Sequence, residues 1–244
     1  MGHNIKAGNQ SKIGLVVLPF IFGQTGSFLS YVRRWQEAGH STIIVDPYRC
    51  FPKPHKPPFF LLKVAFNEKA NVDRLAASFH HLTVIDAILN ARMKLLDQGC
   101  KKIAYIGFGL GGVQALWAAE HRQYSPDLVV AFYPHLIFPR DFPKKAPDFS
   151  KIEAKIMLFF GKQEKITAES LHRAKLAALT YPHVDLNEVS DADHAFAEGH
   201  IQKKWGINIP NWKYYRPAGA ADAISKVNEA LSALRPVEPE CVNL

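Results

Sequence analysis

Residues 106–112, with the sequence IGFGLGG, end an apolar run and bring four glycines within six positions. An apolar run that ends in closely spaced glycines is typical of a strand that turns sharply into a helix. The residue at the tip of such an elbow usually carries a catalytic nucleophile. Here the tip is Gly109, which has no side chain. The stretch therefore predicts a strand–turn–helix elbow with a vacant nucleophile position.

On both sides of the elbow, short apolar runs alternate with segments of helical periodicity. Strands are predicted at residues 13–20, 42–46, 103–108, 128–134, 155–160 and 185–190, and helices at residues 27–38, 68–98, 111–121, 168–180 and 218–234. Strands that alternate with helices form a mostly parallel sheet covered on both faces. The predicted fold class is therefore α/β, a three-layer α/β/α sandwich with a mostly parallel central sheet.

Length and composition indicate one globular domain. A chain of 244 residues fits a single α/β domain. Apolar residues make up 48% of it, which is enough for a sizeable core. We expect one domain over residues 1–244, with flexible ends at about 1–11 and 237–244.

The chain is basic, with a formal net charge of +8. Lysine and arginine are spread along the sequence and form no basic arm or basic–aromatic motif, so we expect no nucleic-acid partner. A small anionic ligand is equally compatible with this charge. The sequence does not indicate an oligomeric state.

The three cysteines, Cys50, Cys100 and Cys241, form no CxxC pair and no zinc-site spacing. A sparse, odd number of cysteines indicates free thiols in a reducing compartment. Residues 1–12 lack the apolar region of a secretory signal, and no run reaches the length of a membrane span. We therefore expect a soluble, cytoplasmic protein without a membrane span and without a metal site.

Three segments that follow predicted strands carry the candidate chemistry. They are the elbow at Gly109, the segment FFGKQEKIT with Glu164, and the segment SDADHAFAEGH with His194. Ligands bind beyond the carboxyl ends of the strands in sheets of this kind. The order elbow, acid, histidine is also the chain order of catalytic triads on α/β-hydrolase sheets.

Several segments in the same order resemble the dienelactone hydrolases, a family with the α/β-hydrolase fold. They are LVVLPFIFGQTG, RRWQEAGHSTIIVDPYR, IGFGLGGVQAL, VVAFYP, LFFGKQE, DHAF and AADAISKVNEAL. The resemblance implies the α/β-hydrolase fold and cleavage of lactones or small carboxyl esters without a cofactor.

The resemblance also implies roles for individual residues. The family's elbow carries a cysteine or occasionally a serine, which a histidine activates and a carboxylate supports; His194 and Glu164 match these positions. The oxyanion hole would be formed by the backbone N–H groups of Leu110, after the nucleophile position, and Ile21, in the loop after the first strand.

The sequence departs from the family pattern at three of these positions. Gly109 stands at the nucleophile, and Phe20 stands where the family's E-I-F-G motif has a glutamate that partners the resting cysteine. A charge that serves an absent thiol only costs desolvation, so the two changes are coherent. Glu164 replaces the usual aspartate, and its extra methylene changes the geometry.

The leading hypothesis is a nucleophile-deficient family member that keeps a small-molecule pocket for a carbonyl or carboxylate ligand. One alternative is an active hydrolase or lyase that uses His194 and Glu164 for acid–base chemistry. Cys50, after the strand at 42–46, is a candidate substitute nucleophile. A third possibility is a non-catalytic scaffold or interaction protein.

Other segments have a structural and a functional interpretation. The proline-rich, aromatic segment 51–66 is either an anchored surface loop or a lid, and the segment 203–217 is either a packed excursion or a cover that receives an anion through Lys213 or Arg216. Adjacent helical histidines at 80–81 point about 100° apart and make a poor metal pair.

Overall fold

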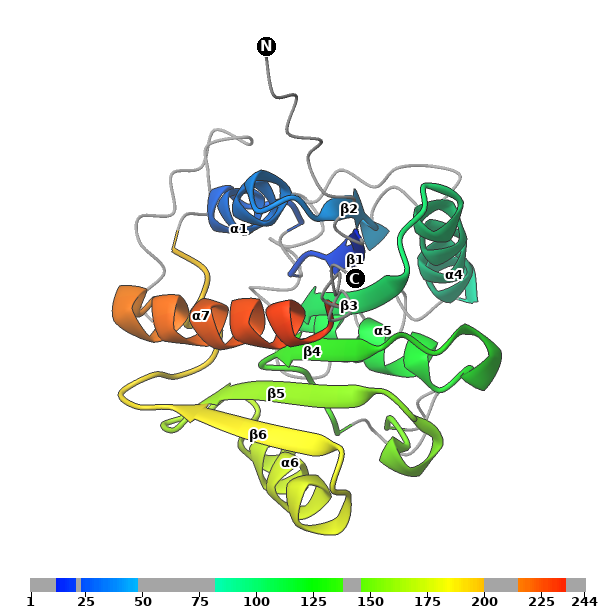
Figure 1. The fold of residues 1–244 in the computed structure, drawn as a ribbon. Helices are drawn as coiled ribbons and strands as arrows, with labels where there is room; N and C mark the ends of the chain where they lie inside the picture. Colours follow the sequence, from blue (N-terminus) through cyan, green and yellow to red (C-terminus); the bar gives the residue numbers. More distant parts are fainter. Residues whose placement is uncertain (1–11, 21–22, 48–81, 138–145, 200–214, 236–244) are drawn as a thin grey trace, which may run out of the picture.

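The computed structural model describes residues 12–20, 23–47, 82–137, 146–199 and 215–235 (Figure 1). The strands are β1 (Ile13–Leu18), β2 (Ser41–Ile44), β3 (Lys102–Phe108), β4 (Leu128–Phe132), β5 (Lys155–Gly161) and β6 (Val184–Val189). The helices are α1 (Gly26–Glu37), α4 (Leu82–Asp97), α5 (Leu110–Ala119), α6 (Ala168–Thr180) and α7 (Pro217–Ala233), with short 3₁₀ turns at Arg122–Tyr124 and Phe149–Lys151.

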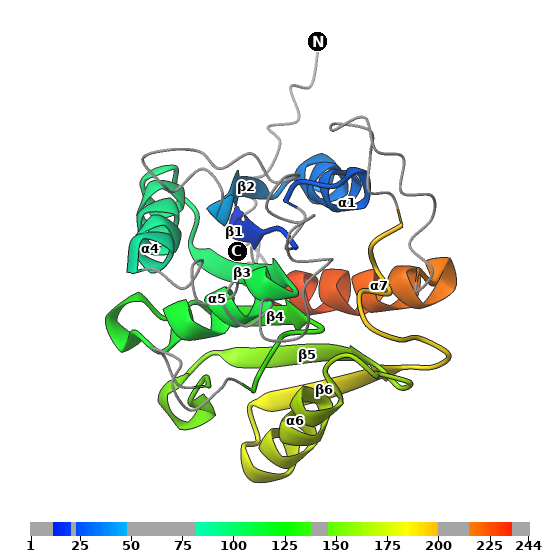
Figure 2. The same cartoon turned by 180° about the vertical axis from the view of Figure 1, so that it is seen from behind.

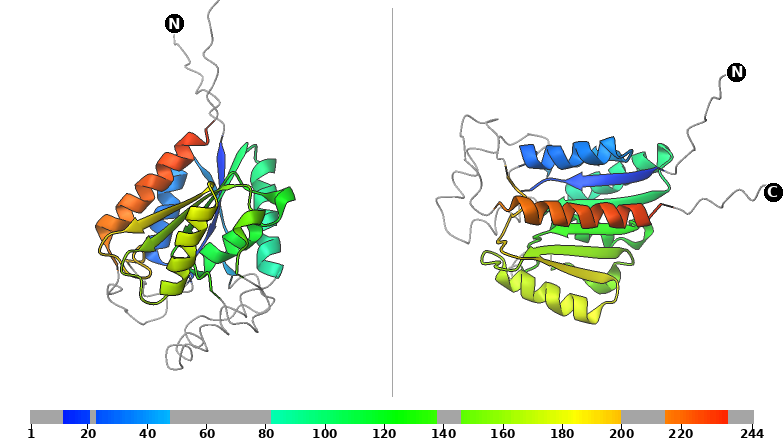
Figure 3. Two further views of the ribbon diagram at one scale, coloured as in Figure 1. Left: turned by 90° about the horizontal axis from the view of Figure 1, so that it is seen from below. Right: turned by 60° about the vertical axis from the view of Figure 1, so that its left-hand side comes forward.

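The strands form one sheet in the order β2-β1-β3-β4-β5-β6, and every pairing is parallel. Helices α1 and α7 cover one face, and α4, α5 and α6 cover the other, as the opposite views in Figures 1 and 2 and the end view in Figure 3 show. The predicted α/β fold class is therefore confirmed. The three layers follow from near-continuous apolar strands, which must be buried on both faces.

Alternate side chains of the strands build two separate cores. Leu15 and Val17 of β1 pack toward α1 and α7, whereas Val16 and Leu18 pack toward α4 and α5. All four are fully buried. This alternation is the period-two geometry of a strand, so each face of the sheet receives its own apolar layer.

Three strands, β1, β2 and β4, end two residues earlier than the sequence predicts, and β2 ends at Ile44. β1 ends at Leu18 because Pro19 has no N–H to continue the ladder. β4 ends at Phe132 because Tyr133 has a φ of +39°, outside the extended region. The predicted helix 68–98 is described only from Leu82 onward.

The elbow between β3 and α5 depends on a very close approach of backbone segments. A Cβ on Gly107 would overlap the Gly111 carbonyl, and a Cβ on Gly111 would lie 2.7 Å from the carbonyl oxygens of both Leu18 and Pro19. Neither backbone neighbour can move without displacing a strand. Glycine is therefore required at these two positions by packing.

We predict that Gly111→Ala lowers the free energy of unfolding by about 3 kcal/mol, because the added methyl group meets two backbone carbonyls. Gly39→Ala is the control, since Gly39 has a φ of +88° but open space around it. That change should cost only about 1 kcal/mol of left-handed backbone strain. Urea denaturation of the two variants measures both values; equal losses would contradict the packing argument.

Candidate functional site

The elbow brings Gly109 to the carboxyl end of the central strand β3. Gly109 has φ +53° and ψ −113°, its N–H donates to the Phe132 carbonyl at 2.9 Å, and its carbonyl accepts the first helical bond from Gly112. Leu110 begins α5, so its N–H is one of the groups that a helix leaves without an intrahelical partner. The second amide expected for an oxyanion hole, that of Ile21, lies outside the described residues.

The ring of Phe20 lies over Gly109. A Cβ on Gly109 would overlap Cδ2 and Cε2 of this ring. The ring is 7% exposed and contacts two further aromatic side chains, with centroid distances of 5.8 Å to Tyr133 and 6.0 Å to His194. Phe20 therefore fills the space above the elbow that a nucleophile's side chain would occupy.

His194 and Glu164 form the assembled pair that the sequence suggested. The Nδ1 atom of His194 lies 3.2 Å from Oε1 and 3.3 Å from Oε2 of Glu164. The Thr167 N–H donates to the same carboxylate at 3.0 Å, and the Glu164 side chain is fully buried. A carboxylate fixed at Nδ1 holds an imidazole with Nε2 available for proton transfer.

Asp193 supports the pair from the backbone. Its Oδ1 accepts the N–H of Lys165 at 2.9 Å and of His194 at 2.8 Å, so it joins the loop after β5 to the loop after β6. Asp191 has a φ of +53°. Both aspartates therefore act in turns, and the described part of the chain contains no group of three or more metal-ligating side chains.

Glu198 is a second buried carboxyl near the site, and the sequence did not single it out. Its Oε2 accepts the Thr25 hydroxyl at 2.6 Å, its Oε1 lies 3.5 Å from the Tyr133 hydroxyl, and its exposed fraction is 0%. It forms no ion pair with the described residues. Burial raises the pKa of this carboxyl from 4.5 to about 7, although the hydrogen bonds from Thr25 and Tyr133 lower it.

Tyr133 joins this carboxyl to the rest of the site. Its ring lies edge-on to His194 at a centroid distance of 5.3 Å, and it is fully buried. Burial, followed by the charge of Glu198, raises the pKa of the Tyr133 hydroxyl well above its usual value. The hydroxyl therefore stays protonated and acts as a donor.

Helix α1 and its cap hold three successive residues of the loop 190–199, which carries His194. The hydrogen bonds are Tyr31 Oη to Ala197 O at 2.8 Å, Thr25 Oγ1 to Glu198 Oε2 at 2.6 Å, and Gly199 N to Ser27 Oγ at 2.8 Å. Thr25 is also the N-cap of α1. These three hydrogen bonds therefore join the start of α1 to the loop that carries His194.

Several sequence-based candidates fall outside the described residues. They are Cys50, the histidines at 80–81, the segment 51–66 and most of 203–217 with Lys213. Cys100 is described; it is buried just before β3, at the opposite end of the sheet from Gly109. Arg216 precedes α7, and its Nε donates to the Asp191 carbonyl at 2.9 Å.

Among the described helices, none combines the length and apolar character that crossing a bilayer requires.

Known proteins share the family pattern and the fold of this chain. The model of the dienelactone hydrolase family matches residues 3–234. A Klebsiella pneumoniae structure assigned as a dienelactone hydrolase is similar, with a TM-score of 0.67 and 18% identity over 93% of this chain and 89% of that one. So is a dienelactone hydrolase-like promiscuous phosphotriesterase from metagenomic libraries, with a TM-score of 0.66 and 18% identity over 95% and 90%. No curated protein sequence matches the chain significantly.

We predict that Glu198→Gln makes the protein more stable at alkaline pH. The native fold raises the carboxyl pKa, so folding binds a proton, and stability falls as the pH rises from 4.5 to about 7. At 1.36 kcal/mol per pKa unit, the loss approaches about 3 kcal/mol. The amide keeps an acceptor for Thr25 and carries no charge.

Urea denaturation from pH 5 to pH 8 tests this prediction. The advantage of the variant should grow up to about pH 7 and then stay constant. Glu37→Gln, at the exposed end of α1, controls for the change in net charge. A constant difference between Glu198→Gln and the wild type at all pH values would show that the carboxyl ionises freely in the fold.

Proposed function

The chain belongs to the dienelactone hydrolase family, and on this basis we propose that it is a nucleophile-deficient member that binds a small carbonyl or carboxylate ligand. The observation that carries the proposal is the Phe20 ring, which fills the space above Gly109. The ligand would bind beside the Phe20 ring, against the partly exposed side chain of His194, because the space directly above Gly109 is filled. The Leu110 amide, with that of Ile21, would receive the ligand oxygen.

Phe20 and Gly109 support the same conclusion in different ways. A glycine removes the attacking atom, and a ring packed over it also removes the space in which an acyl group would form. An elbow residue with a Cβ would bear about 1–3 kcal/mol of strain at this backbone conformation, which glycine relieves. With this pair of residues the elbow would be stable and closed but unable to form a covalent intermediate.

The His194–Glu164 pair favours a second function, acid–base catalysis without a covalent intermediate. The histidine side chain is 11% exposed and its carboxylate partner is fully buried, which is the geometry of an oriented general base. Such a base could activate water or remove a proton next to a carbonyl. Without a nucleophile, ester hydrolysis by this route would be slower by several orders of magnitude than in a complete triad.

We predict that two changes together are needed to restore nucleophilic hydrolysis. Gly109→Cys alone should remain inactive toward 4-nitrophenyl acetate, because the Phe20 ring occupies the position of the new side chain. Phe20→Ala alone opens the space but supplies no thiol. The double variant G109C/F20A should exceed either single variant in kcat/KM by at least about 100-fold.

Acetylation of the introduced cysteine, seen by mass spectrometry, identifies the covalent route. The same double variant with His194→Ala should lose the gain. Activity in G109C alone would contradict the role given to Phe20. Hydrolysis by F20A alone would instead favour direct activation of water by His194.

We predict that the wild-type protein turns over aryl esters and lactones no faster than its His194→Ala variant, if the leading proposal is correct. A measurable turnover that disappears in His194→Ala would favour the acid–base enzyme and would exclude a scaffold. Turnover that survives in His194→Ala but is lost in Cys50→Ala would favour a substitute nucleophile. Steady-state assays of the three proteins separate these cases.

A further inference from the structure

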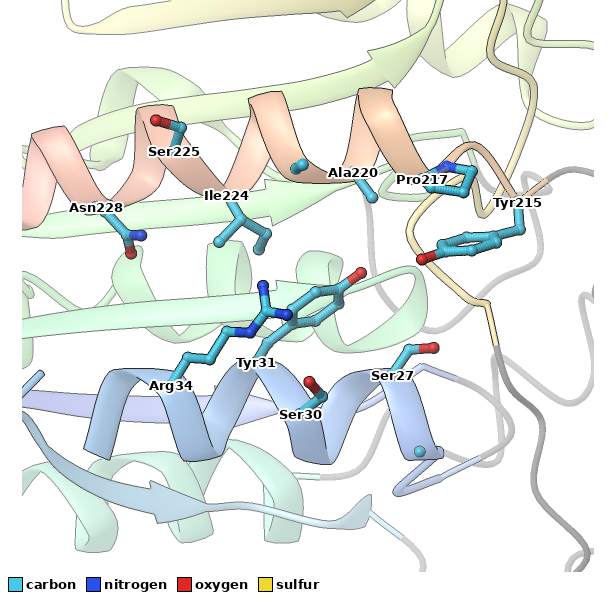
Figure 4. A pocket seen from close by; sticks show the side chains of 12 residues that line it. Ser27, Ser30, Tyr31, Arg34, Tyr215, Pro217, Ala220, Ile224, Ser225 and Asn228 are labelled. Carbon is cyan, nitrogen blue, oxygen red and sulfur yellow. The ribbon is translucent and has the colours of Figure 1, made fainter. Parts of the chain in front are cut away.

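A groove runs between α1 and α7, two parallel helices on the same face of the sheet (Figure 4). It has a volume of about 430 Å³, within the range of small-molecule sites. Its walls share no residue with the elbow or with the His194–Glu164 pair. We call it the α1–α7 groove; its lining residues used below are Ser27, Ser30, Tyr31, Arg34, Tyr215 and Asn228.

Two side chains that line the α1–α7 groove, Arg34 and Asn228, present N–H groups that can only donate, whereas its hydroxyls can donate or accept. Among the described residues of its lining, Arg34 is the one charged side chain, and none is Asp or Glu. Within the described residues, the Arg34 guanidinium and the hydroxyls of Ser30 and Tyr215 form no hydrogen bond or ion pair. The Asn228 carbonyl accepts the indole N–H of Trp35 at 3.0 Å, which leaves its amide N–H₂ free to donate. A ligand that satisfies Arg34 and the Asn228 amide must carry acceptors, and an anionic acceptor suits the guanidinium best.

The floor of the groove is apolar. Tyr31, Ala220 and Ile224 line it and are 7%, 3% and 5% exposed. Figure 4 shows the Arg34 side chain extending along the Tyr31 ring, toward the middle of the groove and away from its own helix. A flat apolar body on this floor would place an attached anionic group within reach of the guanidinium.

We propose that the α1–α7 groove is a second binding site, specific for small organic acids with an apolar body and one carboxylate. Arg34 pairs with the carboxylate, the free hydroxyls and the Asn228 amide donate to ligand oxygens, and the floor covers the apolar part. Guanidinium suits this role because its fork of N–H donors matches a carboxylate.

A ligand in the groove would also affect the loop that carries His194. Two of its lining side chains, Tyr31 and Ser27, make the hydrogen bonds that hold Ala197 and Gly199. The ring of Tyr215 packs on Gly199, where a Cβ would lie 2.7 Å from its Cζ atom. A ligand held between α1 and Tyr215 therefore reinforces the contacts that fix this loop.

The test is a titration of the full-length protein with phenylacetate, 4-hydroxybenzoate and the neutral phenylacetamide, followed by the amide NMR signals of α1, α7 and residues 197–199. Both acids should give saturable shifts in these segments, and phenylacetamide should bind at least tenfold more weakly. Arg34→Gln should weaken binding of the acids by about tenfold, equivalent to about 1.4 kcal/mol. Arg33→Gln, the matched loss of charge on the neighbouring exposed residue, should change it less than twofold.

A second pair of variants tests the location by volume. Ala221 lines the groove and Ala218 does not, and both are exposed on the first half of α7. Ala221→Trp should abolish the shifts, whereas Ala218→Trp should leave them. The proposal is overturned if neither acid shifts these segments at tens of millimolar, if phenylacetamide binds as well as the acids, or if the members of either variant pair behave alike.

Discussion

The backbone carbonyls of Leu18, Pro19 and Gly111 leave no room for side chains where α5 leaves the central sheet. This steric constraint brings the amino end of α5 against β1 and β3 and fixes the place of Gly109 at the edge of the sheet. The loops that follow β1, β4, β5 and β6 begin at this same carboxyl edge of the sheet, because all the strand pairings are parallel. The elbow therefore organises these loops although Gly109 has no side chain.

Gly109 and the Phe20 ring depend on each other in the packing. In a close-packed interior, removing a side chain leaves a cavity that costs stability unless another group fills it. Here a ring from the neighbouring loop fills it and at the same time contacts Tyr133 and His194. The aromatic cluster binds three post-strand loops together, so the vacant position has become part of the core.

Periodicity and strand–loop order were sufficient to predict the layers, the elbow and the convergence of Glu164 with His194, because these depend on local patterns and on parallel topology. The position of the Phe20 ring could not be predicted in this way, since it depends on a contact between segments about 90 residues apart. Glu198 was missed for a related reason. The sequence HAFAEG does not show that its glutamate is buried, because this depends on what packs around the segment. Its partner Thr25 lies 173 positions away. Nothing in the sequence pointed to Tyr133 except its place near the end of the predicted strand 128–134.

The two buried carboxyls near the site differ in what surrounds them, and this difference assigns their roles. Glu164 faces the imidazole of His194 and a backbone N–H, groups that stabilise a negative charge. Among the described residues, Glu198 is hydrogen-bonded by the hydroxyls of Thr25 and Tyr133, and burial outweighs these bonds and raises its pKa, which favours the neutral acid. A neutral carboxyl can hold Thr25 and the loop with His194 together without the cost of a buried charge. Glu164 is therefore the carboxyl that orients the histidine. Glu198 is the carboxyl that holds helix α1 and the loop with His194 together.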